Sequence, residues 1–177
     1  RLAPADEASG VKPGAILDAT SEPKPPSPLR VTIKDYIALT KPKVMTLLLL
    51  TAFGGMVLAD AGMPGGWLIA TVLAGGALAS GGASSINHWM DRDIDRLMSR
   101  TATRPVASER LGGPQALVFG FVLNVLSFGL LWWGANLLAA FLAIGGTLFY
   151  VIIYTKWLKR NTVQNIVIGG AAGAVPP

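Results

Sequence analysis

The chain has 177 residues, of which 51% are hydrophobic and 14% charged, and its formal net charge is +5. This composition excludes an ordinary soluble domain and indicates a membrane protein, while the absence of cysteine excludes disulfides, thiolate metal sites and a cysteine nucleophile. The basic residues lie beside apolar stretches and not on a separate polar domain, so they indicate membrane topology and no binding of nucleic acid.

The N-terminal segment, residues 1–30, is rich in proline, serine and alanine and has no apolar stretch of the length that a secretory signal requires. We expect a disordered tail on the cytoplasmic side. Its acidic residues argue against a mitochondrial transit peptide, which would be rich in arginine and poor in acids.

Four apolar stretches follow that are long enough to cross a membrane. No Lys or Arg occurs between Val44 and Asp91 or between Gln115 and Thr155, so each interval can hold two spanning helices. We expect spans at 44–61, 67–86, 115–133 and 137–154, and a truncated fifth at 163–177. The second span is rich in small residues that allow close helix contact. The predicted fold is an all-α, polytopic transmembrane helical bundle, of which residues 31–177 form the N-terminal part.

The links between the spans alternate in charge. Basic residues precede the first span, five arginines lie in the 87–114 loop and three basic residues lie within 156–160, whereas the links at 62–66 and 134–136 carry no charge. The positive-inside rule therefore predicts that the N-terminus and the 87–114 loop face the cytoplasm, in a bacterial cytoplasmic (inner) membrane.

An acidic motif begins where the second span ends. Asn87, Asp91 and Asp95 are spaced by four residues, so on a helix they lie nearly on one face with neighbours about 6 Å apart. Two carboxylates at that distance repel by roughly 3 kcal/mol at an effective dielectric of 20. Arg92 and Arg96 could neutralise part of this charge, as in a solvated, self-paired turn. An incomplete set of hard oxygen ligands is also what Mg²⁺ uses when it is shared with a substrate phosphate.

Basic residues on the same side of the membrane extend this interpretation. Arg100, Arg104 and Lys159 could grip a phosphorylated ligand, because guanidinium groups suit phosphate oxygens. A cavity open to the cytoplasm, with a divalent cation and a basic surround, suits an amphiphile that bears a diphosphate. The chemistry that follows is loss of diphosphate to give an allylic carbocation, which is prenyl transfer. The acceptor stays open at this point.

The spacing of this motif is similar to that of a known family of membrane proteins. The spacing Asn87-x3-Asp91-x3-Asp95, followed by Arg100-Thr101-x2-Arg104-Pro105, resembles the first aspartate-rich motif of the UbiA superfamily of membrane prenyltransferases. Within that superfamily, three segments resemble the heme O synthases (protoheme IX farnesyltransferases). They are residues 39–44 (LTKPKV), 91–101 (DRDIDRLMSRT) and 164–177 (QNIVIGGAAGAVPP).

The resemblance implies a ring of nine transmembrane helices around a central cavity, and transfer of farnesyl from farnesyl diphosphate to heme B to make heme O. It implies that Asn87, Asp91 and Asp95 are the catalytic and Mg²⁺-binding residues. The residues implied to bind the diphosphate are Lys41, Arg100, Arg104, Tyr154 and Lys159. A second aspartate-rich motif and about four helices would lie beyond Pro177, so we expect an N-terminal fragment that is inactive alone. The implied partners are the lipid bilayer, both substrates and a downstream heme A synthase.

Two other functions stay open from the sequence. One is a different UbiA-type transferase, acting on 4-hydroxybenzoate or a chlorophyll precursor. The other is a transporter whose acids form an ion site, although such a site is expected nearer the middle of the membrane. The single histidine, His88, is interpreted as a hydrogen-bonding residue at a helix end and not as a heme ligand.

Overall fold

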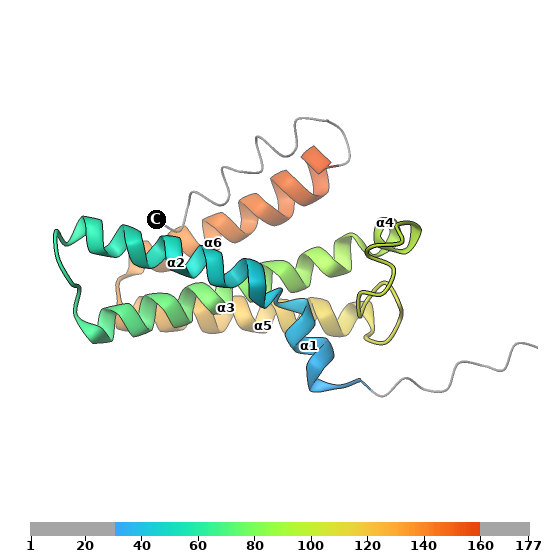
Figure 1. The fold of residues 1–177 in the computed structure, drawn as a ribbon, viewed down its shortest axis with the longest axis horizontal. Helices are drawn as coiled ribbons and strands as arrows, with labels where there is room; N and C mark the ends of the chain where they lie inside the picture. Colours follow the sequence, from blue (N-terminus) through green and yellow to red (C-terminus); the bar gives the residue numbers. More distant parts are fainter. Residues whose placement is uncertain (1–30, 160–177) are drawn as a thin grey trace, which may run out of the picture.

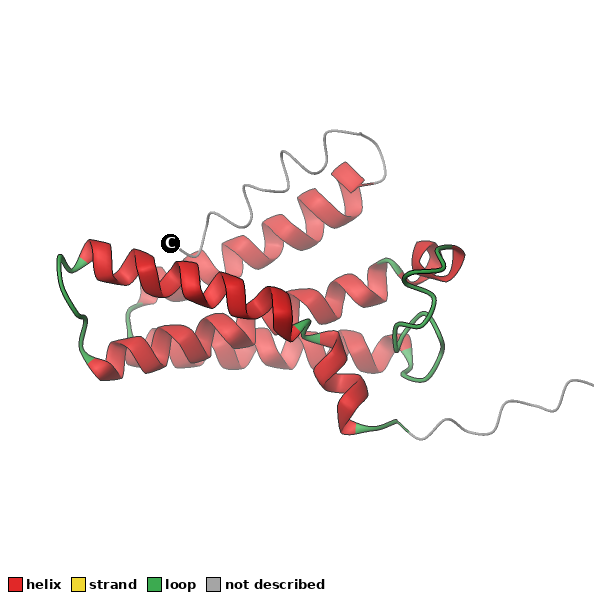
Figure 2. Ribbon diagram, in the orientation of Figure 1, coloured by secondary structure: helices red, strands yellow, loops and turns green. Residues whose placement is uncertain are grey.

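The computed structural model describes residues 31–159, which form helices joined by short links and one longer loop, with no strand among them (Figure 1; Figure 2). The helices are α1 (Ile33–Leu39), α2 (Pro42–Ala59), α3 (Gly66–Met90), α4 (Arg92–Leu97), α5 (Gly113–Gly134), α6 (Leu137–Leu148) and η1 (Phe149–Leu158). Four helices, with α6 and η1 counted as one, are long and apolar enough to cross a membrane. The predicted all-α bundle with four spans is confirmed: this is an integral membrane protein. The predicted tail at 1–30 and fifth span at 163–177 lie outside the described residues.

Local sequence signals set several helix ends. α2 begins at Pro42, whose fixed φ and missing N–H suit the first helical position. α6 begins after Asn136, whose side-chain oxygen accepts a hydrogen bond from the backbone N–H of Ala139 at 2.8 Å. α3 continues to Met90, four residues past the end predicted for the second span. Asn87 therefore lies within a long helix, whose hydrogen bonds hold its backbone in place.

The closest helix pair is α3 with α5, which run side by side over most of their length (Figure 1). A Cβ atom added to Gly82 would lie 2.7 Å from the carbonyl oxygen of Gly120, a distance that real Cβ atoms do not adopt. The Ser127 hydroxyl donates a hydrogen bond to the backbone oxygen of Gly75 at 2.7 Å. Small residues thus let the two backbones approach and bond directly, as is typical of helices packed in lipid.

α2 and the continuous α6–η1 helix also pack against α3, but with much less of their surface. Ala52 is the one buried residue of α2 within the described part, and most large apolar side chains of α2 and α6 are exposed. Exposed apolar surface of this extent suits contact with lipid or with further membrane helices.

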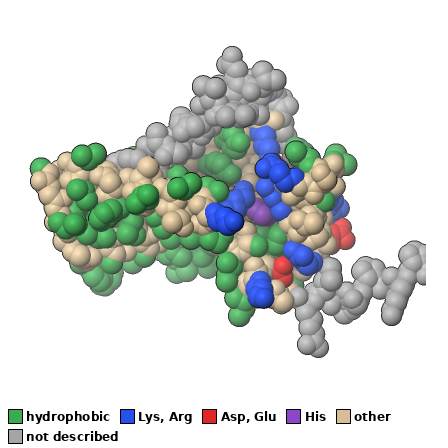
Figure 3. Space-filling model, in the orientation of Figure 1, with side chains coloured by type: hydrophobic (Ala, Val, Ile, Leu, Met, Phe, Trp, Pro, Cys, Tyr) green, Lys and Arg blue, Asp and Glu red, His purple; other side chains and the backbone are tan. Residues whose placement is uncertain are grey.

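Lys and Arg side chains gather at one end of the molecule, whereas the visible face of the rest shows hydrophobic and other uncharged groups (Figure 3). At that end, α1 and the 98–112 loop pack on the ends of the long helices around a small apolar core of Leu39, Val106, Leu111 and Ala116. An ion pair of 3.2 Å between Asp35 and Arg110 ties α1 to the loop. The loop is therefore folded against the bundle and holds its side chains in place.

The last described helix is unusual. η1 is a π-helix of 10 residues, Phe149–Leu158, in which the Thr155 hydroxyl donates to the backbone oxygen of Tyr150 at 3.0 Å. π-helices are rare, and when they occur they are often found at functional sites. The wider turn changes which side chains of this segment share a face, and Thr155 and Lys159 both lie against the end of α3.

Candidate active site

Asn87 is the centre of a buried polar network at the cytoplasm-facing end predicted for α3. Its Oδ1 accepts a hydrogen bond from Lys41 Nζ at 3.1 Å. Its Nδ2 donates to Asp91 Oδ2 at 2.7 Å and to the Thr155 hydroxyl at 3.1 Å. One amide side chain thus joins three parts of the chain: the start of α2, the end of α3 and η1.

Asp91 lies at the junction of α3 and α4 and its side chain is fully buried. Lys159 Nζ lies 2.6 Å from Oδ2 of Asp91, a short charge-assisted contact. The second carboxylate oxygen, Oδ1, is buried and has no hydrogen-bond partner among the residues that the structure describes. Buried carboxylate oxygens normally have partners, so this atom is a candidate to bind a cation or a donor group from a ligand.

Asp95 is held by the loop that follows it. Nη1 of Arg104 donates to both carboxylate oxygens of Asp95, at 2.9 and 2.8 Å, and the Thr101 hydroxyl donates to its backbone oxygen at 3.0 Å. The helical hydrogen bonds continue across the junction, since the N–H of Asp91 bonds to the oxygen of Asn87 and that of Asp95 to the oxygen of Asp91. The one-face spacing of the motif is therefore kept although α3 and α4 are separate helices.

Arg92 and Arg96, which by their place in the sequence could neutralise part of the acidic charge, pair with other groups in the part of the chain that the structure describes. The guanidinium of Arg92 stacks over the ring of Trp89 and donates to its backbone oxygen, and Arg96 pairs with Glu109. Neighbouring residues on a helix point in different directions, so the arginines next to each acid face away from it. Lys159 and Arg104, from distant segments, take this place.

The other residues predicted to bind diphosphate have different surroundings. Arg100 is exposed, and its side chain makes no hydrogen bond or ion pair within residues 31–159. Tyr154 is half-buried and stacks on Tyr150, with ring centroids 5.3 Å apart. Their part in ligand binding stays a prediction.

Two residues of the site have no signal in the sequence. Thr155 bonds to Asn87, and Tyr150 lines the cavity described below. From its position near a span end, Tyr150 resembles an ordinary interfacial aromatic residue. A π-helix has no sequence signature comparable to the hydrophobic period of an α-helix, so the register that brings these residues inward could not be foreseen.

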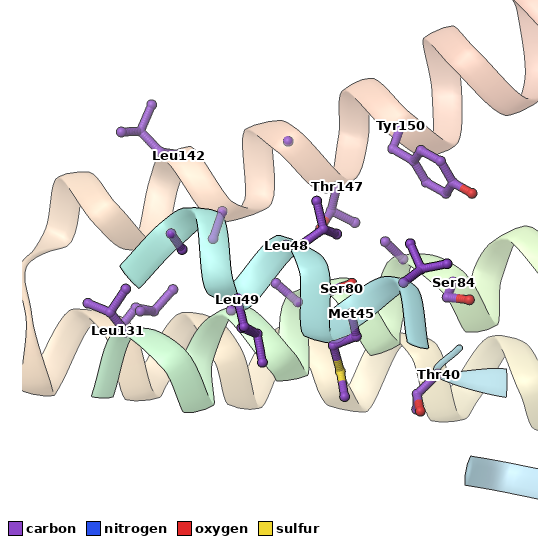
Figure 4. Close-up of a pocket in the computed structure, with 18 of the residues that line it drawn as sticks. Thr40, Met45, Leu48, Leu49, Ser80, Ser84, Leu131, Leu142, Thr147 and Tyr150 are labelled. Atoms are coloured by element: carbon purple, nitrogen blue, oxygen red, sulfur yellow. The ribbon is translucent and has the colours of Figure 1, made fainter. Parts of the chain in front are cut away.

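An apolar cavity of about 500 Å³ opens from the network and lies between α2, α3 and α6. Thr40, Ser84 and Tyr150 lie at its polar end, and Leu131 and Leu142 lie at the opposite end (Figure 4). Lys41 also lines it, so one side chain contacts both the cavity and Asn87. The volume lies within the range of about 300–1,000 Å³ that is typical of small-molecule sites.

The charges of the network favour an anionic ligand. Three cations, Lys41, Arg104 and Lys159, face two carboxylates, Asp91 and Asp95, which leaves a formal excess of one positive charge. Burial, followed in size by the repulsion of Arg104, lowers the pKa of Lys41 from 10.5 to about 8. Lys41 therefore stays largely protonated at pH 7, and a bound anion would stabilise its charged form.

The oxygen atoms of the motif also suit a hard divalent cation. Asn87, Asp91 and Asp95 present amide and carboxylate oxygens, and Asp91 Oδ1 is free to bind. Among residues 31–159, no three His, Cys, Asp or Glu side chains are grouped so that they could hold a metal ion by themselves. The set fits an ion such as Mg²⁺ that takes its remaining ligands from water and a substrate.

The sequence of this chain matches the family described as the UbiA prenyltransferase family over residues 48–177. A protoheme IX farnesyltransferase of Thermus thermophilus is 54% identical over 146 residues, 82% of this chain and 24% of that protein. The protein of this name from Chloroflexus aurantiacus is 47% identical over 93% of this chain and 28% of its own length. Protoheme IX farnesyltransferase 1 of Saccharopolyspora erythraea is 51% identical over 87% of this chain and 49% of its own length. The chain thus spans between a quarter and a half of these relatives, and no solved structure matches it.

Proposed function

Because the chain belongs to the UbiA prenyltransferase family, we propose that the protein is an integral membrane enzyme that transfers the farnesyl group of farnesyl diphosphate to heme B, giving heme O. The names of the relatives support heme as the acceptor. The relatives are about two to four times as long as the aligned segment, so we assign the activity to the whole protein and expect residues 1–177 alone to be inactive.

The observation that carries this proposal is the junction between the cavity and the polar network. An apolar cavity of about 500 Å³ suits an isoprenoid chain, and the cationic network at one end suits a diphosphate. Lys41 belongs to both, so an amphiphile with its chain in the cavity would place its charged group beside Asn87, Asp91 and Lys159. A transporter site would not need a long apolar cavity beside the acids.

We propose that Asn87, Asp91 and Asp95 would hold a Mg²⁺ ion. When bound, it would supply charge neutralisation for a leaving diphosphate. Lys41 and Lys159 bind diphosphate oxygens directly, and Arg104 keeps the Asp95 carboxylate in position. The allylic C1–O bond then breaks, its electron pair leaves with the diphosphate, and C1 of the farnesyl cation bonds to the terminal vinyl carbon of the acceptor. The cation that this leaves on the neighbouring carbon takes up a water molecule, which releases a proton and leaves a hydroxyl group.

The network lies at the end of the bundle where the Lys and Arg side chains gather (Figure 3). By the positive-inside rule we propose that this end faces the cytoplasm, in a bacterial inner membrane. Farnesyl diphosphate, a charged amphiphile, would then enter from the cytoplasmic side. Heme O made there would pass to an enzyme that oxidises it further, such as a heme A synthase.

The test uses the full-length protein purified in detergent or lipid, with farnesyl diphosphate and heme B, with and without Mg²⁺. We expect heme O to form only when Mg²⁺ is present, and expect Asp91→Ala and Asp95→Ala each to lower turnover by about 100-fold or more. Asp60→Ala is the control, because Asp60 is an exposed acid at the C-terminal end of α2.

Near-normal turnover of both variants at normal expression would contradict the proposed site. Transfer to 4-hydroxybenzoate in place of heme would keep the family chemistry and change the acceptor.

A further inference from the structure

One face of α3 carries hydrogen-bonding atoms that the protein itself does not satisfy. Ser84, His88 and Asp91 follow one another at i, i+4 and i+7, so their side chains share a face. All three are buried, with exposed fractions of 7%, 3% and 0%. Among the described residues, the Ser84 hydroxyl, both ring nitrogens of His88 and Oδ1 of Asp91 have no hydrogen-bond partner.

Buried polar atoms without partners are costly, roughly 1–3 kcal/mol for each group, and native proteins contain few of them. Unpartnered polar atoms on three residues that share one helix face are therefore unlike isolated packing defects. The network involving Asn87 and Lys159 accounts for Oδ2 of Asp91 only. Within residues 31–159, no group satisfies the hydroxyl or the imidazole.

The positions of Ser84 and His88 along α3 indicate which part of a ligand these two residues would contact. Ser84 lies at the polar end of the cavity, as does Tyr150 (Figure 4), and Lys41 also lines the cavity. His88 is one turn further along the helix, next to Asn87 and one turn before Asp91. Along α3 the order is therefore apolar cavity, Ser84, His88 and then the charged network. The pair lies at the boundary between the two halves of the site.

We propose that Ser84 and His88 form a hydrogen-bonding pair that binds the phosphate nearer the isoprenoid chain, at the ester oxygen of a prenyl diphosphate. This inference rests on the proposed function and adds a subsite to it. A chain in the cavity and a terminal phosphate among Lys41, Lys159 and Asp91 would place the C1–O bond beside the pair. A hydroxyl and an imidazole N–H can each donate a hydrogen bond to a phosphate oxygen.

The pair is suited to the step in which the bond breaks. When the C1–O bond cleaves heterolytically, the electron pair stays on the ester oxygen and negative charge grows there. Hydrogen bonds from Ser84 and His88 to that phosphate would strengthen as the charge grows, and no proton needs to be transferred. The two residues are thus expected to bind the leaving group more tightly in the transition state than in the substrate.

The test compares two ligands in the full-length protein with Mg²⁺. Farnesyl diphosphate needs the pair, whereas farnesol has the same chain and no phosphate. We expect His88→Leu to weaken binding of farnesyl diphosphate roughly tenfold and Ser84→Ala severalfold, while the affinity for farnesol stays unchanged. His88→Gln keeps a neutral donor and should recover much of the affinity. Thr46→Ala is the control, because the exposed Thr46 hydroxyl of α2 bonds to the Pro42 oxygen of its own helix and does not line the cavity.

Turnover gives a second measurement. With heme B saturating and farnesyl diphosphate varied, His88→Leu should both raise KM and lower kcat, whereas a loss of folded protein would lower kcat and leave KM unchanged. The inference is overturned if His88→Leu binds farnesyl diphosphate as the wild type does, or if farnesol and farnesyl diphosphate are weakened equally. A different outcome separates the two proposals. If the variants show these differences but the wild-type protein does not prenylate heme, the proposed acceptor is refuted and the inference stays intact.

Discussion

The α3–α5 pair and the two outer helices, α2 and α6–η1, differ in how they are held. α3 and α5 approach until only glycine fits between Gly82 and Gly120, and they bond across the contact through Ser127. α2 and α6–η1 bury little of their surface and enclose the cavity between themselves and α3. The first pair is a rigid support, and the outer helices are the walls of a binding space.

The charges of the site follow the same division. Asn87 and Asp91 belong to α3, the most tightly packed helix, whereas Lys41 begins α2 and Lys159 follows η1. The acidic end of the site is thus held by the most tightly packed helix, whereas Lys41 and Lys159 belong to the ends of the outer helices. A ligand that binds both the acids and these lysines would contact α2, α3 and the end of η1 at the same time.

The largest expected effect tests the rigid pair. Gly82→Val should lower the free energy of unfolding by about 3 kcal/mol, because a Cβ at Gly82 would lie 2.7 Å from the backbone oxygen of Gly120 and the helices would have to separate. Gly54→Val in α2 is the matched control, since a Cβ there meets nothing within 4 Å. Denaturant titration in detergent measures both. Equal losses would contradict the distinction between support and wall.

The second effect concerns a cation carried by an outer helix. Lys159→Met removes the ionic partner of the fully buried Asp91, which should lower the free energy of unfolding by about 2 kcal/mol at pH 7. The value is below that of a fully buried pair because Lys159 is itself partly exposed. Lys156→Met, an exposed lysine of η1, should have little effect in the same titration. Similar losses for the two variants would show that the Asp91 contact contributes nothing.

The third effect is a pH dependence. Because burial lowers the pKa of Lys41 to about 8, its charge is present below pH 8 and lost above it, so affinity for inorganic pyrophosphate with Mg²⁺ should fall up to about tenfold from pH 8 to pH 9. In Lys41→Arg this fall should disappear, since arginine stays charged. The effect of raising the pH on folding stability has the opposite sign. Between pH 8 and 10.5 the unfolded state binds more protons at this residue, so its contribution to stability rises with pH.

Calorimetric titration of pyrophosphate at several pH values measures the first part of this prediction. A wild-type affinity that is flat from pH 7 to pH 9 would show that Lys41 does not bind the anion as a titrating cation.

The smallest effect is the loss of one hydrogen bond between α3 and α5. Ser127→Ala should cost about 1 kcal/mol of unfolding free energy, because the Gly75 oxygen loses its side-chain donor in a buried contact. Thr51→Ala removes a hydroxyl that bonds only to its own helix in α2 and is exposed, so its stability should change by less than about 0.5 kcal/mol. If Thr51→Ala lowers the unfolding free energy more than Ser127→Ala does, the hydrogen bond between α3 and α5 stabilises the protein no more than one within a single helix.

The sequence predicted the spans well because hydrophobic length and charge alternation are local properties. It also indicated Asn87, Asp91 and Asp95, since a spacing of four is sufficient to place them on one face. It could not show which cation pairs with which acid, because the pairing of Asp91 with Lys159 joins residues 68 positions apart. The helix α3 continues to Met90, beyond the predicted span, because the polar residues after Ile86 continue the helix.

The π-helical form of η1 has a consequence for comparing related sequences. Each residue of an α-helix turns the chain by about 100°, so the same residues wound as an α-helix would rotate Thr155 and Lys159 away from Asn87 and Asp91 by roughly that angle. The winding of this segment and its number of residues therefore depend on each other. In an alignment, a relative with one residue fewer here would keep the same face toward α3 with an ordinary α-helix.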